Sequence, residues 1–286
     1  MYNIPKHTRK NSYLKFHYDC AEEEKNKDSN NELLDAISLT SITLTGRNYI
    51  TYLRLSPENV PIIIKFWDTV SAYNTFINNP HSVSKMVNGK KILVDPETRE
   101  ELTHGFLPRL TLYYEAITQL GPTFTPSDNE MKILFSKYIK GTLEYREKLI
   151  LRSFLFLEDH AVLPVFKNKG LDIREEAMAL LDLHGDGSWL LRQGSIIDTD
   201  LCNAIVFSFM VDGNKYNFVL LSIVGYGCYT KDLLRGQILP TKTNNKIALP
   251  MVQNDEIFPC IIDLVDHMLE KYKVRHDKFV LVHQME

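Results

Sequence analysis

The residue that most constrains how this chain can fold is an arginine, Arg192. Ser188 to Gln193 reads as a β-strand with apolar residues on both faces, except for Arg192, which shares its face with Leu190. A strand with two apolar faces is expected to be buried on both sides. A guanidinium buried there without an anion would cost several kcal/mol. Arg192 is therefore expected to meet an anion, either a bound ligand or a buried carboxylate such as Asp212.

A capped amphipathic helix is expected just before this strand. Asp172 can cap it, with Glu175 at the reciprocal capping position. Its apolar face consists of Ile173, Ala177, Leu180 and Leu181. Arg174 lies in the first turn, where the helix dipole disfavours a cation by about 0.3–1 kcal/mol. Two interpretations stay open: Glu175 and Glu176 neutralise Arg174, or Arg174 and Arg192 converge on one bound dianion.

The stretch from Asp172 to Ser195 resembles the signature of the Src homology 2 domain, the phosphotyrosine-binding module. The shared pattern is Arg-x-x-Ala-x-x-Leu-Leu, a glycine-bearing turn, an aromatic residue, Leu-Leu-Arg and then a Gly-Ser pair. The resemblance covers Phe166 to Val282 and includes a second amphipathic helix at Phe258 to Leu269. It implies an α+β fold for residues 166–286, in which an antiparallel sheet is flanked by two helices.

The resemblance also implies a phosphotyrosine site. Arg192 matches the family's phosphate-binding arginine, and Arg174 matches its helix arginine. A guanidinium can hold two phosphate oxygens in fixed geometry, which a lysine cannot. Ser195, together with the backbone amides of Gln193 and Gly194, would line the loop around the phosphate.

This sequence departs from the family on the third strand. Tyr216 stands where the family usually has a histidine, so the expected pocket loses a cation and gains an aromatic ring. Tyr216 could stack on the phosphotyrosine ring, or it could be an ordinary strand tyrosine with an exposed hydroxyl. Lys215 could supply the missing charge.

A long insertion is the second departure. Residues 230–257 replace a short loop of the family and contain several apolar clusters, which is unusual for a passive loop. The insertion resembles those in phosphotyrosine-binding modules of effectors from intracellular bacteria. We expect it to close over the ligand as a lid, or else to pack elsewhere. A lid would make recognition depend little on the residues flanking the phosphotyrosine.

The part of the chain before residue 160 resembles no family that we recognise. Residues 1–32 are polar and read as a flexible segment, and residues 33–160 predict a mainly helical domain with a small sheet, of unknown function. The expected elements are strands within Ile42–Leu55, a helix over Val60–Ile77 after a Ser56 cap, a hairpin over Met86–Val94, a helix over Leu107–Leu120, and a long helix from Ser127 to about Leu157. The boundary to the second domain is expected near Asp159 to Lys169.

Composition narrows the class of protein. The 286 residues carry a net charge of −3, so no global basic field points to nucleic acid. Four isolated cysteines read as reduced thiols of a cytosolic protein, and no apolar run approaches the ~18 residues of a membrane span. Delivery into a host cytosol is compatible with these features.

The sequence therefore predicts a non-enzymatic adaptor or effector that binds tyrosine-phosphorylated proteins without a metal or cofactor. Two alternatives stay open: a structural or virion protein that uses the same fold without a ligand, or an enzyme whose site lies before residue 160. A tyrosine phosphatase needs five residues between its cysteine and arginine, whereas six separate Cys228 from Arg235.

Overall fold

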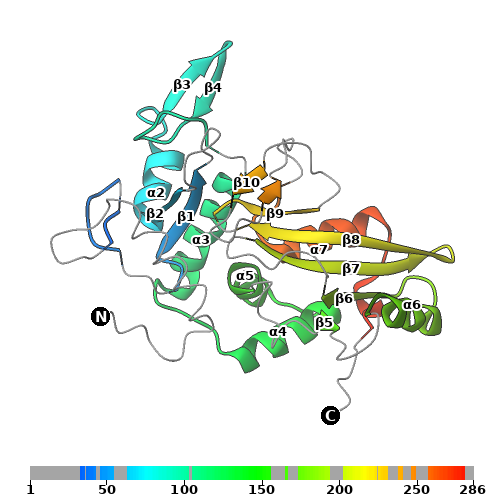
Figure 1. The fold of residues 1–286 in the computed structure, drawn as a ribbon. Helices are drawn as coiled ribbons and strands as arrows, with labels where there is room; N and C mark the ends of the chain where they lie inside the picture. The colour runs from blue at the N-terminus through cyan, green and yellow to red at the C-terminus, as the bar shows by residue number, and fades with distance from the viewer. Residues whose placement is uncertain are drawn as a thin grey trace. The chain divides into compact units, whose positions relative to one another are not determined.

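The computed structural model of the chain divides into two compact units (Figure 1). Unit 1 comprises residues 1–125 with 224–227, and unit 2 comprises residues 126–223 with 228–286. The structure describes residues 33–35, 37–42, 46–54, 63–102, 105–155, 165–166, 173–193, 202–223, 225–230, 238–240, 246–248 and 257–280. The expected flexible segment 1–32 lies outside them.

Unit 1 is built around a buried aromatic cluster. Its elements are β1 (Tyr49–Arg54), β2 (Ile63–Asp68), α2 (Thr69–Tyr73), the π-helical turn η1 (Asn74–Asn78), β3 (Ser84–Val87), β4 (Lys90–Leu93) and α3 (Phe106–Leu120). Trp67 of β2 stacks on Tyr52 of β1 at 5.2 Å between ring centroids, and Phe106 meets both rings edge-on. Phe76 closes the cluster. One small sheet, one long helix and the turn between them thus share one core.

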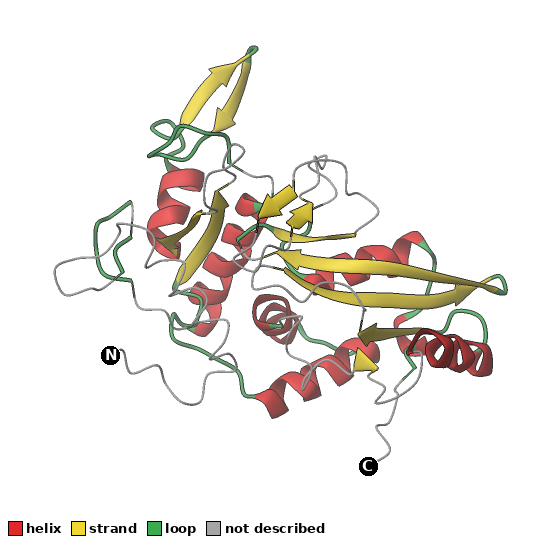
Figure 2. Ribbon diagram, viewed as in Figure 1, coloured by secondary structure: helices red, strands yellow, loops and turns green. Residues whose placement is uncertain are grey.

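The helix expected over Val60–Ile77 is wrong in its first part. Ile63 to Asp68 is a strand that pairs antiparallel with β1 (Figure 2). Ile63, Ile64, Phe66 and Trp67 are the β-branched and aromatic residues that favour a pleated, half-buried surface. The helix begins only after Asp68, whose Oδ1 accepts a hydrogen bond from Ser71 N at 2.8 Å. The expected Ser56 cap lies outside the described residues, and unit 1 is less helical than expected.

The predicted hairpin and the following helix are confirmed. β3 pairs antiparallel with β4 across Asn88 and Gly89, whose φ angles are 49° and 77°. Both values are positive, as a type I′ turn requires. The helix α3 ends at Leu120, with Gly121 as its C-cap.

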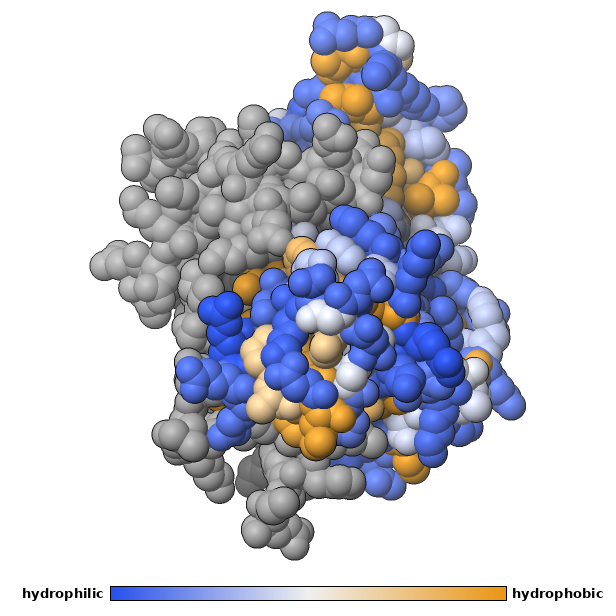
Figure 3. All heavy atoms as spheres, turned by 90° about the vertical axis from the view of Figure 1, so that its right-hand side faces the viewer, coloured by the Kyte–Doolittle hydropathy of each residue, from blue (hydrophilic) through white to orange (hydrophobic). Residues whose placement is uncertain are grey.

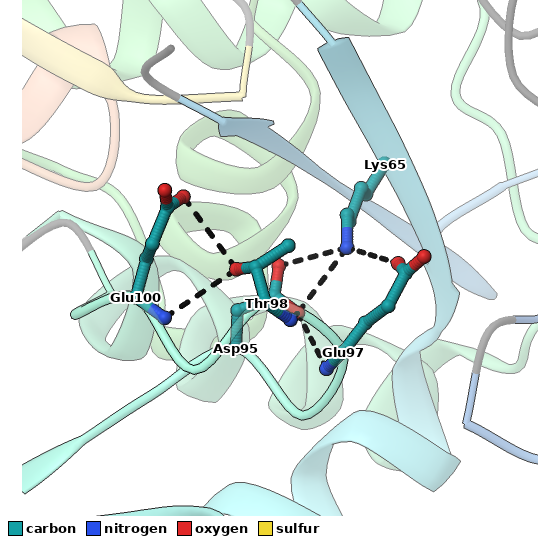
Figure 4. Close-up of polar contacts among 5 residues, drawn as sticks. All are labelled: Lys65, Asp95, Glu97, Thr98 and Glu100. Atoms are coloured by element: carbon teal, nitrogen blue, oxygen red, sulfur yellow. Dashed lines mark hydrogen bonds and ion pairs between the residues drawn. The ribbon is translucent and has the colours of Figure 1, made fainter. Parts of the chain in front are cut away.

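A buried ion pair anchors the turn that follows β4 (Figure 4). Lys65 on β2 is only 1 % exposed and lies 2.9 Å from Asp95 Oδ2. The same ammonium group pairs with Glu97. Asp95 Oδ1 accepts hydrogen bonds from the backbone of Glu97 at 2.8 Å and of Thr98 at 3.2 Å. The carboxylate therefore both neutralises the lysine and shapes the turn.

The long helix expected from Ser127 to Leu157 is two helices, α4 (Asp128–Ile139) and α5 (Tyr145–Phe154). Ser127 caps α4, as the sequence predicts, and the structure adds Glu130 as its reciprocal partner in a capping box. A second start signal breaks the run, because Glu147 Oε2 accepts a hydrogen bond from Glu144 N at the beginning of α5. The predicted apolar face of α4 is buried, namely Met131, Leu134, Phe135, Tyr138 and Ile139.

The centre of unit 2 is a five-stranded sheet with the order β5-β6-β7-β8-β9 (Figures 1 and 2). The strands are β5 (Val165–Phe166), β6 (Trp189–Gln193), β7 (Cys202–Val211), β8 (Asn214–Ile223) and β9 (Gly227–Thr230). β5 runs parallel to β6, whereas β6, β7 and β8 are antiparallel. Two helices complete this part, α6 (Ile173–His184) and α7 (Ile261–Lys271). The expected α+β class with an antiparallel sheet and helices is thus present.

The two faces of this sheet have different coverings. Leu190 packs with Ala177 and Leu181 of α6. On the opposite face, Phe209 lies 4.8 Å from the ring of Tyr272, at the C-terminal end of α7. Trp189, on the same face as Phe209, meets Phe279 at 4.6 Å. Phe279 also forms an isolated parallel β-bridge with Trp189, and residues beyond 280 lie outside the described range.

The expected boundary near residue 160 differs from the observed division, because α4 and α5 belong to unit 2. Arg152 of α5 forms a bidentate ion pair with Asp263 of α7, with 2.6 Å between Nε and Oδ1 and 2.9 Å between Nη2 and Oδ2. This hydrogen bonding raises the pKa of Arg152. The hydroxyl of Tyr138 on α4 donates a hydrogen bond to Asp266 Oδ1 at 2.6 Å. Burial of the Tyr138 hydroxyl, together with the nearby Asp266 carboxylate, raises the pKa of Tyr138. These polar contacts tie residues 128–154 to the second helix of the sheet.

Within the insertion 230–257, the structure describes one further pair of strands, β10 (Ile238–Pro240) and β11 (Lys246–Ala248), which are antiparallel. The rest of the expected lid, apart from residues 230 and 257, lies outside the described residues. No helix within the described ranges has the length and apolar character needed to cross a membrane.

Candidate functional site

Arg192 is buried in the middle of the sheet, as its strand pattern predicts. It is 8 % exposed, and its neighbours Leu190 and Leu191 are buried. Its Nε lies 3.2 Å from Ser208 Oγ, and its Nη2 lies 3.3 Å from Asn217 Oδ1. Ser208 Oγ and Asn217 Oδ1 are themselves 2.8 Å apart. A hydroxyl and an amide on two neighbouring strands thus hold the guanidinium along its Nε–Nη2 side.

The strand register explains why these three residues meet. Arg192 pairs with Val206, which pairs with Val219, so these residues form one row across β6, β7 and β8. The next row on the same face holds Leu190, Ser208 and Asn217. Rows on one face are two residues apart, or roughly 6.7 Å. The long side chain of Arg192 can therefore reach Ser208 and Asn217 diagonally.

The helix α6 packs on the sheet face that carries Arg192, and its contacts with β8 indicate where Arg174 lies along that face. Asp182 of α6 forms an ion pair with Lys215, and Met178 Sδ lies 3.8 Å from Asn217 Nδ2. Residues four apart lie one above the other on a helix, about 6 Å along its axis. These two contacts are four residues apart on α6 and two residues apart on β8. Extending the alignment by one more turn, we infer that Arg174 lies level with the row of Val219. That row contains Arg192. Arg174 is exposed, in the first turn of α6.

Lys215 lies on the same face as Arg192 but two rows away from it. It pairs with Met210 in the register and forms an ion pair with the carboxylate of Asp182. Two rows correspond to roughly 13 Å along the strands. Lys215 is therefore committed to α6 and lies at the far end of this face from the row of Arg192.

Tyr216 lies on the other face of the sheet. It pairs with Phe209 and stacks on that ring at 5.2 Å, and its ring centroid is 6.1 Å from that of Tyr272. Adjacent residues on a strand point to opposite faces, and Asn217 is the neighbour that points toward Arg192. The expectation that Tyr216 stacks on a ligand held by Arg192 is therefore corrected: the sheet separates the two side chains.

The expected phosphate loop is only partly visible. Gln193 ends β6 opposite Ile205. Gly194 and Ser195 lie outside the described residues, so their expected role stays a prediction. Asp212, the alternative partner of Arg192, occupies the β7–β8 turn with a φ of 50° and is exposed. It lies just beyond the C-terminal end of β7, whereas Val206, the residue level with Arg192, lies in the middle of that strand.

Sequence reasoning missed Ser208 and Asn217. Ser208 is the one polar residue within Ile205 to Met210, and a two-residue turn at Asp212-Gly213 places Asn217 directly opposite it. That pairing could have been read from the sequence as a polar patch in an apolar sheet. Among the described residues, no group of three or more His, Cys, Asp or Glu side chains could hold a metal ion.

The comparisons with known proteins leave this arrangement without a named relative. No protein-family model, no curated protein and no solved structure matches the chain.

Proposed function

We propose that the chain binds tyrosine-phosphorylated proteins, with Arg192 as the phosphate anchor and Arg174 as a second cation. The observation that carries the proposal is the guanidinium of Arg192, which is buried in an apolar strand and donates hydrogen bonds to Ser208 and Asn217. Because these contacts fix its orientation, the group is preorganised for the bidentate geometry that phosphate oxygens favour. Phosphotyrosine would supply about −1.5 to −2 charges and three acceptor oxygens.

The position of α6 supports the role of Arg174. Met178 and Asp182 contact β8, and extending this alignment by one helical turn supports a position of Arg174 level with the row of Arg192. An exposed cation in the first turn of a helix is otherwise unfavourable. A dianion between Arg174 and Arg192 would offset that cost. The function proposed here is a non-enzymatic one, namely docking in an adaptor or effector.

The test is a titration of the full chain with a phosphotyrosine peptide and with the same peptide unphosphorylated. We expect binding of the phosphorylated peptide alone. Arg192→Ala should weaken it by about thirtyfold or more, because truncating one member of a buried charged pair costs ~2–5 kcal/mol. Arg174→Ala should weaken it less, because Arg174 is exposed. A degenerate phosphopeptide array tests the expected low selectivity for flanking residues.

Arg146→Ala is the matched control, because Arg146 is an exposed arginine on α5. It removes the same charge and should leave binding unchanged. Arg192→Lys keeps the positive charge but lacks the paired N–H donors of a guanidinium, so it should lose most of the affinity. Its circular dichroism spectrum should show that the variant remains folded. Equal binding of the two peptides by the parent chain, or folded Arg192 variants that bind within twofold of the parent, would refute the assignment.

A further inference from the structure

The β3–β4 hairpin of unit 1 has a composition that the proposed function does not use. Ser84 to Leu93 contains three lysines and no acidic residue, in a chain whose net charge is −3. The hairpin forms a two-stranded sheet of its own. In Figure 1 it extends beyond the other elements of unit 1, and Figure 3 shows hydrophobic and hydrophilic residues side by side on it, at the top of the view.

The register places one apolar side chain opposite one lysine on each face of the tip. Met86 pairs with Lys91, and Val87 pairs with Lys90. Met86 is 66 % exposed and Val87 is 39 % exposed, and both lysines are exposed as well. Neighbouring residues on a strand point to opposite faces. The tip is therefore apolar and cationic on both sides, and neither face is turned into the core.

The base of the hairpin is held firmly, in contrast to its tip. Arg99 donates to the carbonyl oxygens of Ser82 at 3.0 Å and Ser84 at 3.3 Å, and Lys85 Nζ donates back to Arg99 O at 2.9 Å. The buried pair of Lys65 and Asp95 fixes the turn that carries Arg99 (Figure 4). An isolated two-stranded hairpin is marginally stable in water. These contacts keep it formed and present the tip in a fixed geometry.

We propose that the tip of this hairpin docks on an anionic lipid surface. Met86 and Val87 would enter the interface, and Lys90 and Lys91 would remain among the anionic headgroups while their methylene stems lie along the apolar layer. Opposite charge favours this occupant, because each lysine near an anionic leaflet strengthens binding by about fivefold. The proposal does not depend on phosphotyrosine binding.

Two other occupants fit the tip less well. A specific protein interface needs roughly 800 Å² from each partner, and two apolar side chains cannot supply that area. Single-stranded nucleic acid is bound by aromatic side chains that stack on bases, and Ser84 to Leu93 contains no aromatic residue. A lipid surface requires only a small apolar wedge flanked by cations, which is what the tip provides.

The first test is sedimentation of the full chain with vesicles of phosphatidylcholine, with and without about 30 mol% phosphatidylserine. We expect salt-sensitive binding to the mixed vesicles only. Lys90→Gln with Lys91→Gln should weaken it by about 25-fold, which is about fivefold for each lysine. Met86→Ser with Val87→Ser should weaken it by about tenfold. The matched control is Lys132→Gln with Ile133→Ser, which removes an exposed lysine and an exposed apolar residue from α4.

The second test places a reporter at the tip. The two native tryptophans, Trp67 and Trp189, are fully buried, so brominated lipids should not quench them. Val87→Trp should add a signal that brominated mixed vesicles quench. Failure of the parent chain to bind mixed vesicles, equal binding by parent and tip variants, or an unquenched tip tryptophan would each overturn the proposal. Tip-dependent binding of an acidic protein or an RNA, with no vesicle binding, would overturn it in favour of that partner.

Discussion

At the scale of single residues, the chain buries two cations in different ways. Arg192 donates hydrogen bonds to a hydroxyl and an amide on neighbouring strands, and Lys65 lies against a carboxylate that is as deeply buried as itself (Figure 4). An ion pair at 1 % exposure on both sides is costly to break, because the remaining charge stays out of water. The two sites should therefore respond differently to removal of the cation.

Lys65→Met should lower the free energy of unfolding of unit 1 by about 3–5 kcal/mol, because it leaves Asp95 buried and charged. Urea denaturation followed by Trp67 fluorescence, in a Trp189→Phe background, measures this. Adding Asp95→Asn should recover part of the loss, while the exposed Lys90→Met serves as the control. A loss below about 1 kcal/mol would contradict the expectation that the buried pair is costly to break.

At the scale of elements, the attachment of α5 to α7 is testable. Arg152→Met removes both hydrogen bonds to Asp263 and should destabilise unit 2 by about 2 kcal/mol. Arg146→Met, on the exposed side of the same helix, should change stability by less than about 0.5 kcal/mol. Trp189 fluorescence in a Trp67→Phe background reports unit 2 alone. If Arg152→Met instead shifted the unfolding transition reported by Trp67, α5 would belong to the cooperative unit of unit 1.

Elements with strong local signals are the ones that the sequence predicts well. Asn88-Gly89 and Asp212-Gly213 specify their hairpins, because few residue pairs adopt two positive φ angles. The capping box at Ser127 likewise marks the start of α4. Tertiary pairing decides the failure over Ile63 to Asp68, where β-branched and aromatic residues favour a strand and pairing with β1 forms it in place of the expected helix.

In the candidate site, too, local features were predictable from the sequence, whereas the pairing of distant strands was not. The period of two in β6 correctly predicts that Arg192 is buried. Tyr216 was assigned by its position in a family pattern, and the observed register turns it away from Arg192. The partner Asn217 lies 25 residues from Arg192 in the sequence. The two residues meet because of the register between β6 and β7, and the length of the segment between these strands does not specify that register. Side-chain alternation was therefore predictable, but the meeting of the strands was not.

At the scale of the whole molecule, unit 1 is assembled from two separate parts of the chain. Gly225 O accepts hydrogen bonds from Leu53 N at 3.0 Å and from Arg109 Nη2 at 2.9 Å. A Cβ at Gly225 would lie 2.6 Å from Leu53 N. The short segment 224–227 is thus built into unit 1, although it connects β8 to β9 of the five-stranded sheet and its last residue, Gly227, is the first residue of β9.

Gly225→Ala should destabilise unit 1 by about 2–4 kcal/mol, through the clash with Leu53 in addition to backbone strain. Gly213→Ala is the matched control, because Gly213 has the same φ of 72° with nothing within 4 Å of the added Cβ. It should cost only about 1 kcal/mol. Trp67 fluorescence during denaturation separates the two, and equal costs would show that β1 yields to the added methyl group.

Because Gly225 contributes to unit 1, unit 1 cannot complete its folding during synthesis until Gly225 has been translated. When Leu53 and Arg109 have left the ribosome, the carbonyl that both of them bind is still about 100 residues away from being made. At about 5–20 residues per second, the first unit must wait roughly 5–20 s without the carbonyl of Gly225. During that interval the backbone N–H of Leu53 on β1 lacks this hydrogen-bond partner and is free to pair with another chain. A chaperone that shields nascent strand edges would therefore matter most while residues 126–223 are being translated.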